Sequence, residues 1–148
     1  MSLKERITDD MKAAMRARDT HRLSTIRLLL AALKQKEVDE RVVLNDADVL
    51  SIIEKLIKQR RDSITQYMAA NRKDLADVEA YELSLLQSYM PQQLSSDEIL
   101  AEVSGAIAEL GATGAKDMGK VMAVLKDRLA GRAEMSRIST VVKEMLSG

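Results

Sequence analysis

The residues that could bind a phosphate lie near the C-terminus, where two glycines each precede a basic residue. The stretch GKVMAVLKDRLAGRAEMS (119–136) contains Gly119-Lys120 and Gly131-Arg132, with an apolar run between them. A glycine inside a helix costs up to about 1 kcal/mol relative to alanine, so it usually permits a close approach. The approaching group is either a neighbouring helix or a sugar–phosphate backbone that meets the N–H groups at a helix N-terminus.

The charge of this stretch shifts the balance toward a phosphate contact. From residue 111 onward the chain has 7 basic and 4 acidic residues, although Lys+Arg and Asp+Glu are equal at 23 each over the whole chain. Lys116, Lys120, Arg132 and Lys143 can share one end or face of a small helical unit. A patch of this size favours a weak, salt-sensitive contact with RNA, because each cation that neutralises a phosphate releases a counterion.

A second group of charges interrupts the apolar stripes of other helices. Arg27, Arg60 and Glu82 each stand where the helical period calls for an apolar side chain. An unpaired buried charge is costly, so we expect these three side chains to meet as a structural ion pair. No nucleophile or general base accompanies them, and we therefore expect no catalytic residue.

The other residues that could carry chemistry do not form a recognisable site. His21 is the single histidine, and Cys is absent. His21 alone provides neither a Ser-His-Asp relay nor a metal site with several histidines, so we expect an ordinary surface histidine. The sequence predicts no metal and no cofactor.

The composition is that of a helical protein with a packed core. The chain has 148 residues, of which 46% are hydrophobic, 31% charged and 2% aromatic. So few aromatic side chains argue against a β-sandwich and against a platform that stacks exposed bases. The N-terminus has no apolar signal core, and the longest apolar run, LLLAAL (28–33), is too short to span a bilayer. We expect a cytoplasmic protein without membrane contact, and a monomer, because no sustained heptad seam is evident.

The elements that must position these residues are all helices. A period of 3.6 residues dominates, with Thr20 and Asn45 as expected N-caps and Ser95 with Glu98 as a capping box. Pro91 marks the clearest boundary between units. The sequence predicts an all-α, multihelical fold with an N-terminal four-helix unit (1–92) and a C-terminal three-helix unit (93–148). The expected helices are 3–18, 20–40, 46–71, 73–89, 96–110, 117–130 and 136–146, with Gly131 as the residue that ends the sixth.

Four stretches resemble the GatB/YqeY family. They are LSTIRLLLAALKQKEVD (23–39), KLIKQRRDSI (55–64), NRKDLADVEAYELSLLQSYMPQQLS (71–95) and DMGKVMAVLKDRLAGRAEMSRISTVVKEML (117–146). Their order and extent cover nearly the whole chain, so it is similar to the free-standing YqeY-like proteins. The resemblance implies an all-helical architecture of two units.

The resemblance also implies a function. The same module forms the C-terminal tail of the B subunit of tRNA-dependent amidotransferases, where it helps to recognise tRNA and does not hold the catalytic site. The glycine-basic pattern of the family falls on Gly119, Lys120, Gly131 and Arg132, with Lys143 on the last helix. No catalytic domain accompanies the resemblance, so we do not expect transamidation by this chain unaided.

The leading hypothesis is a non-catalytic adaptor that binds tRNA or another structured RNA through its C-terminal unit. Lys116, Lys120, Arg132 and Lys143 would contact phosphates, while Gly119 and Gly131 would let the backbone come near. Two alternatives stay open. One is an accessory to a glutamine-dependent amidotransferase, a carbon–nitrogen ligase with glutamine as amide donor. The other is a protein-interaction scaffold for an amidotransferase subunit or a synthetase.

Overall fold

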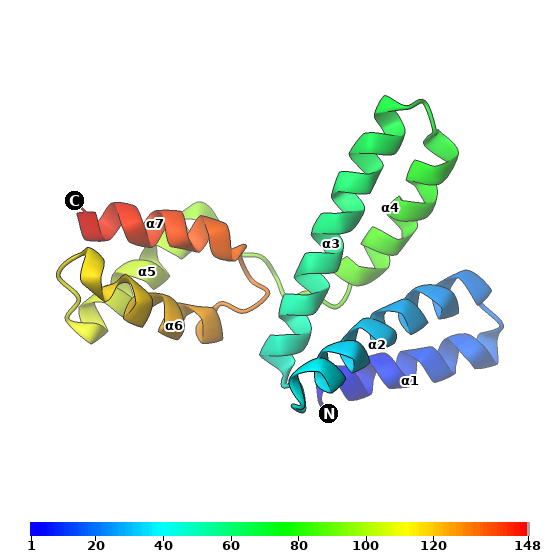
Figure 1. The fold of residues 1–148 in the computed structure, drawn as a ribbon, viewed down its shortest axis with the longest axis horizontal. Helices are drawn as coiled ribbons and strands as arrows, with labels where there is room; N and C mark the ends of the chain where they lie inside the picture. Colours follow the sequence, from blue (N-terminus) through cyan, green and yellow to red (C-terminus); the bar gives the residue numbers. More distant parts are fainter. Residues whose placement is uncertain (148) are drawn as a thin grey trace. The chain divides into compact units, whose positions relative to one another are not determined.

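Residues 1–147 fold into seven α-helices and one short 3-10 helix. The computed structural model describes residues 1–147, and this range contains no strand (Figure 1). The prediction of an all-α, multihelical fold is confirmed. The helices are α1 (Leu3–Ala17), α2 (Thr20–Glu40), α3 (Asp46–Ala69), α4 (Lys73–Gln87), α5 (Ser96–Leu110), η1 (Ala115–Asp117), α6 (Met118–Arg128) and α7 (Met135–Ser147). None of the helices in this range is long and apolar enough to cross a membrane.

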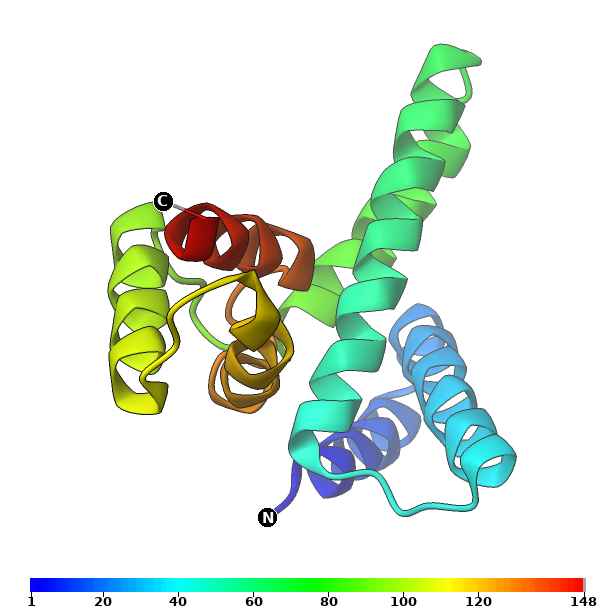
Figure 2. The same ribbon diagram turned by 60° about the vertical axis from the view of Figure 1, so that its left-hand side comes forward.

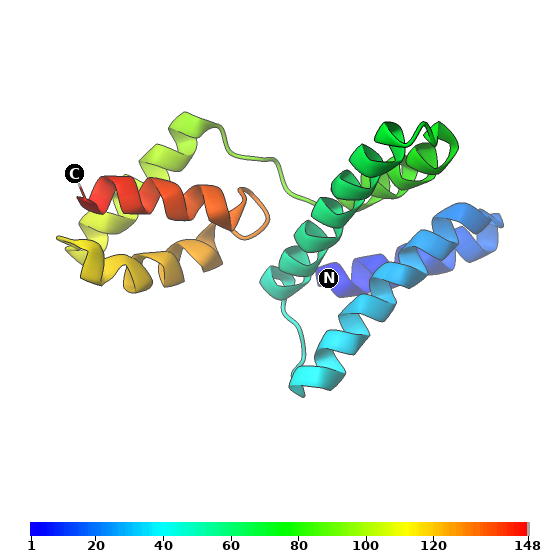
Figure 3. The same ribbon diagram turned by 45° about the horizontal axis from the view of Figure 1, so that its top comes forward.

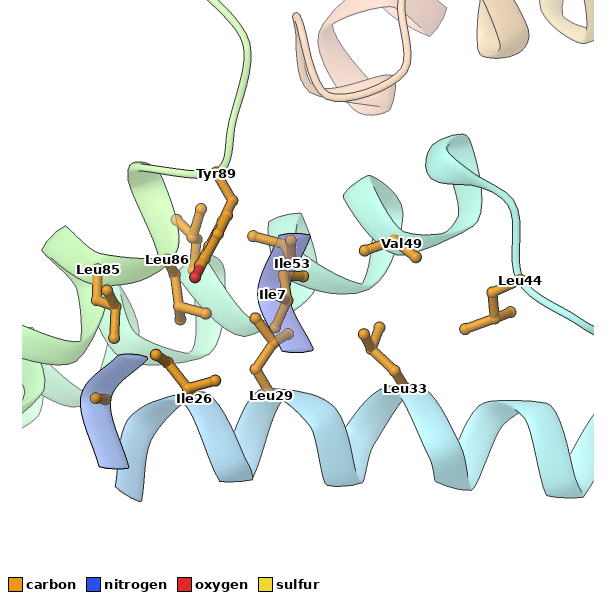
Figure 4. Close-up of a cluster of buried hydrophobic side chains, with 12 residues drawn as sticks. Ile7, Ile26, Leu29, Leu33, Leu44, Val49, Ile53, Leu85, Leu86 and Tyr89 are labelled. Carbon is orange, nitrogen blue, oxygen red and sulfur yellow. The ribbon is translucent and has the colours of Figure 1, made fainter. Parts of the chain in front are cut away.

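The N-terminal unit, Met1–Met90, consists of two helical hairpins. Helix α1 packs against α2, and α3 packs along α4, as different views of the ribbon show (Figures 1 and 2). The buried stripe of α2 is Ile26, Leu29 and Leu33, which point toward Ile7 and Ile53 of the neighbouring helices (Figure 4). Burial of each such side chain contributes roughly 1.5–3 kcal/mol, so this stripe fixes which face of α2 is turned away from water.

Helix starts are set mainly by side-chain caps. Asn45 and Ser95 each form the reciprocal capping box, the first with Asp48 and the second with the expected Glu98. The expected cap at Thr20 is wrong by one position, because the Asp19 carboxylate accepts the hydrogen bond from the Arg22 N–H and Thr20 is already helical. Both residue types are good N-caps, and the sequence alone did not choose between neighbours.

The end of the N-terminal unit is anchored by a buried tyrosine. The Tyr89 hydroxyl donates to Asp10 Oδ2 at 2.6 Å, and the Arg6 guanidinium lies 5.1 Å from the ring centroid. Burial, helped by the hydrogen bond to Asp10, raises the pKa of Tyr89 well above its usual value. The phenol therefore stays neutral and ties the end of α4 to α1.

The C-terminal unit begins at Pro91 and packs α5, α6 and α7 around one core (Figure 3). Its fully buried side chains include Ile99, Val103, Val121, Leu125 and Ile138. The sequence placed the boundary after residue 92. Pro91 and Gln92 lie in the second unit, and Gln92 O accepts a hydrogen bond from the Arg132 side chain.

Candidate nucleic-acid interface

The approach to α6 is a tight turn that presents small and charged residues. The chain leaves α5 at Gly111 in a left-handed conformation and then forms the single 3-10 turn η1. Asp117 stands at the N-cap of α6 but does not cap it; its Oδ2 accepts from the Thr113 N–H at 2.9 Å. That hydrogen bond, with smaller contributions from Lys120 and Lys116, lowers the pKa of Asp117. The N-terminus of α6 therefore has no side-chain cap.

Gly119 lies in the first turn of α6 and faces open space. A Cβ built on Gly119 would meet no heavy atom within 4 Å, and its φ is not in the left-handed region. Neither a neighbouring helix nor the backbone conformation therefore requires glycine here. Of the two explanations that the sequence left open, packing against a helix is excluded, and close approach from outside remains.

The two lysines beside Gly119 are exposed at the positive end of α6. Lys116 on η1 and Lys120 on α6 make no ion pair within residues 1–147. A cation is unfavourable near a helix N-terminus, where the helix dipole is positive. Lys116, Gly119 and Lys120 are thus three locally unfavourable choices around one turn, a pattern that is expected where function overrides stability. We call Lys116, Gly119 and Lys120 the α6 entry.

Lys143 comes from the last helix. It is exposed in the second half of α7, and α7 returns to contact η1. This return brings the C-terminal part of α7 to the same end of the unit as the start of α6 (Figure 1). Lys143 therefore lies on the helix that contacts η1, and it remains a candidate for the same surface.

Gly131 and Arg132 lie at the opposite end of α6, which corrects the expectation of one shared basic patch. Helix α6 has 11 residues and so separates its two ends by about 16 Å. The loop from α6 to α7 lies on the far side of the unit from η1 (Figure 1). Two glycine-basic pairs that look equivalent in the sequence therefore cannot contact the same phosphate.

The Gly131-Arg132 pair instead holds the start of the unit. Arg132 O accepts from the Leu94 N–H at 2.8 Å, Arg132 Nε donates to Gln92 O at 3.3 Å, and Gly131 O accepts from the Gln93 side chain at 2.6 Å. Helix α6 ends at Arg128, three residues before Gly131, whose φ of 73° is left-handed. Gly131 is thus the third residue of a turn closed by Arg132 N and Leu129 O, rather than the residue directly after a helix cap.

The interior charges form a cluster that differs in membership from the expected one. Arg60 Nε lies 2.7 Å from Glu82 Oε2 and 3.3 Å from Glu79 Oε2, and all three side chains are largely buried. Glu79 was missed, although it lies three residues before Glu82 and hence on the same face of α4. The Glu79 Oε2 atom is buried and has no hydrogen bond beyond this ion pair.

Arg27 is not part of this cluster, which corrects the expectation that it meets Glu82. Arg27 is exposed and makes no ion pair within the described chain. The reason is that the leucine run at 28–30 places apolar residues on several faces of α2, so the sequence pattern does not show which face is buried. The buried face centres on Leu29, which turns Arg27 toward water.

His21 is exposed as expected, but it has an aromatic partner that the sequence did not reveal. Its ring stacks on Tyr81 of α4 at a centroid distance of 4.0 Å and an interplanar angle of 22°. The two residues are 60 positions apart, so only the packing of α2 on α4 brings them together. No group of three or more His, Cys, Asp or Glu side chains in residues 1–147 could hold a metal ion.

Comparisons with known proteins place this sequence in a family. Residues 4–146 match the family described as Yqey-like protein. Relatives named "Altered inheritance of mitochondria protein 41, mitochondrial" include one from Eremothecium gossypii, 39% identical over 79% of this chain and 66% of the relative. A second, from Vanderwaltozyma polyspora, is 43% identical over 55% of this chain and 44% of the relative. A third, from Pyrenophora tritici-repentis, is 28% identical over 89% of this chain and 76% of the relative.

These relatives also bear on the length and on the compartment of the protein. The chain spans 66% or less of the length of the first two. All three are named mitochondrial, so the expectation of a cytoplasmic protein is contradicted by the names of its relatives. Composition could not have decided the compartment, because a helical protein folds in water in the same way on either side of an organelle membrane.

Proposed function

This chain belongs to the YqeY-like protein family, and we propose that it is a non-catalytic adaptor that binds tRNA or another structured RNA at the α6 entry. The observation that carries the proposal is the open surface of Gly119, which lies between exposed Lys116 and Lys120. A backbone N–H without a Cβ above it lets a phosphate oxygen approach more closely than any other residue would.

The electrostatics of the α6 entry fit an anionic ligand. The helix dipole and both lysines make the start of α6 positive, while Asp117 is the acid that faces them. A bound phosphate would offset the positive charge of the two lysines, which is unfavourable beside the positive end of the helix dipole.

The expected recognition is of the RNA backbone. Two or three neutralised phosphates give a log–log salt slope of about −2 to −3 for a duplex region, which means weak binding that fades at moderate salt. An A-form helix is read mainly by its phosphates and 2′-hydroxyls, which suits a surface that offers amide and ammonium donors. The α6 entry contains no aromatic side chain that could read a base.

A charge-reversal experiment tests the proposal. The double variant Lys116→Glu/Lys120→Glu should fold, because glutamate is favourable at a helix N-terminus. It should lose most of its tRNA binding and reduce the magnitude of the salt slope by about 2. The matched control is Lys55→Glu/Lys58→Glu, which reverses two exposed lysines of α3. Equal tRNA affinity of both variants and the unmodified protein would refute the proposal.

A further inference from the structure

The strongest concentration of positive charge lies in the N-terminal unit. Residues 11–36 contain seven Lys or Arg and a single acid, Asp19, in a chain whose net charge is zero. This segment forms the second half of α1, the turn and most of α2, two helices that pack against each other (Figure 1). The excess is larger than that of the C-terminal stretch, which has 7 basic and 4 acidic residues.

Most of these cations have no acidic partner. Lys36 pairs with Glu40, and no ion pair is formed by the other six within residues 1–147. Asp19, whose carboxylate caps α2 by accepting from the Arg22 N–H, can offset only one of these positive charges. The unpaired cations are Lys12, Arg16, Arg18, Arg22, Arg27 and Lys34.

The arginines gather around the turn between α1 and α2. Arg16 lies in the last turn of α1, Arg18 is its left-handed C-cap with φ of 57°, and Arg22 follows at the start of α2. Arg16 and Arg18 are exposed, and Arg22 is half-buried. The planar guanidinium fork matches two phosphate oxygens at once, so three arginines around one turn are suited to a polyphosphate backbone.

The same turn carries the exposed aromatic stack. His21 immediately precedes Arg22, and its partner Tyr81 keeps 37% of its surface exposed. Aromatic faces beside a positive surface are the usual means of holding an unpaired base without reading its sequence. A lipid surface fits less well, because the only large apolar side chains exposed between residues 11 and 36, Met15 and Leu28, come from different helices.

We propose that the α1–α2 turn is a second RNA-binding surface, which takes the phosphates of a single-stranded or loop segment and stacks one unpaired base beside Tyr81. We call this surface the hairpin site; it consists of Lys12, Arg16, Arg18, Arg22, His21 and Tyr81. It shares only its ligand class with the α6 entry, and it belongs to the other unit. Two weak sites on one chain would raise the affinity for a single RNA well above that of either.

The test uses the full chain with two probes, total tRNA and an oligouridylate about 15 nucleotides long, whose length matches the footprint of small single-strand binders. The variant Lys12→Gln/Arg16→Gln/Arg18→Gln removes three exposed cations without reversing charge. Its control, Lys55→Gln/Lys58→Gln/Lys126→Gln, removes three exposed lysines elsewhere. We expect the first of these variants, the hairpin variant, to bind oligouridylate at least about tenfold more weakly, and its salt slope to be smaller in magnitude by about 2. The control should bind as the unmodified protein does.

A second variant tests the stack. Tyr81→Leu should weaken oligouridylate binding by about fivefold or more, whereas Tyr81→Phe should preserve it, since stacking needs the ring and not the hydroxyl. Unchanged helicity in circular dichroism shows that each variant is folded. Equal oligouridylate affinity of the hairpin variant and its control would overturn the proposal.

Two further outcomes separate this inference from its rivals. If the hairpin variant binds both RNAs normally but no longer binds vesicles of phosphatidylserine and phosphatidylcholine, the surface is a membrane site and the proposal is wrong. If Lys116→Glu/Lys120→Glu abolishes tRNA binding while the hairpin variant binds normally, the α6 entry stands and the hairpin site falls. The reverse result upholds the hairpin site and rejects the α6 entry.

Discussion

Replacing Gly119 with alanine should make the protein more stable and a poorer RNA binder. The added methyl group meets no atom within 4 Å, and the backbone at Gly119 is one that alanine adopts without strain. An alanine in an exposed helix is favoured over glycine by about 1 kcal/mol, and by about half of that in the first turn, where fewer helical bonds depend on it. A gain of about 0.5–1 kcal/mol corresponds to a rise of roughly 2–8 °C in the unfolding midpoint of a unit of this size.

The same substitution, Gly119→Ala, should weaken the affinity for RNA. A methyl group over the α6 entry holds a phosphate oxygen away from the backbone and weakens a charge-assisted hydrogen bond. Losing about half of such a bond costs about 1 kcal/mol, which is roughly a fivefold loss of affinity. Thermal unfolding and a tRNA titration at low salt, on the same preparation, measure both quantities.

Gly105 provides the matched control. It is exposed in the interior of α5, in the same unit, and a Cβ there also meets nothing within 4 Å. Gly105→Ala should therefore stabilise the protein by about 1 kcal/mol and leave the RNA affinity unchanged. If Gly119→Ala stabilises the protein and binds tRNA as tightly as Gly105→Ala does, no ligand approaches Gly119 and the reasoning is refuted.

Three further predictions concern stability. Arg60→Met leaves two carboxylates of α4 facing each other and should lower the free energy of unfolding by about 2–3 kcal/mol, measured by urea denaturation; an unchanged midpoint would contradict the pairing. Tyr89→Phe removes the buried hydrogen bond to Asp10 and should cost about 1–2 kcal/mol in the same assay, whereas Tyr81→Phe should cost little. The pKa values of Glu98 and Asp117 are held below their ordinary 4.5 and 3.8, chiefly by backbone hydrogen bonds. The stability that these two carboxylates give to the folded state is therefore complete above about pH 5 and is lost as pH falls through the lowered pKa values. Glu98→Gln, which keeps the capping box, should flatten this acid dependence, and an identical pH profile would refute the assignment.

The helices themselves were predictable from local chemistry. Capping residues such as Asn45 and Ser95 act within four residues of themselves, so a short window of sequence contains all the information that they use. The choice between Asp19 and Thr20 was missed because both can cap, and the difference lies in backbone angles.

The sequence could not show which residues lie close together in the folded protein. Gly119-Lys120 and Gly131-Arg132 look alike as dipeptides, yet one pair is open to solvent and the other is bonded to the chain entering α5. The same limit applies to His21, whose stack on Tyr81 exists only because α2 packs on α4. The basic excess of residues 11–36 is present in the sequence, but only the packing of α1 against α2 shows that these cations belong to one helical hairpin.

The most direct test of the central claim is an amide NMR titration of the full chain with tRNA. The chain has 6 glycines, whose amide signals fall in a sparsely populated region of the spectrum, so Gly119, Gly131 and Gly105 can be followed separately. The proposed α6 entry predicts the largest shift or broadening at Gly119 and Lys120, with Gly131 and Gly105 little changed. Perturbation centred on Gly131, or none between residues 116 and 120, would contradict the proposal that RNA binds at the start of α6.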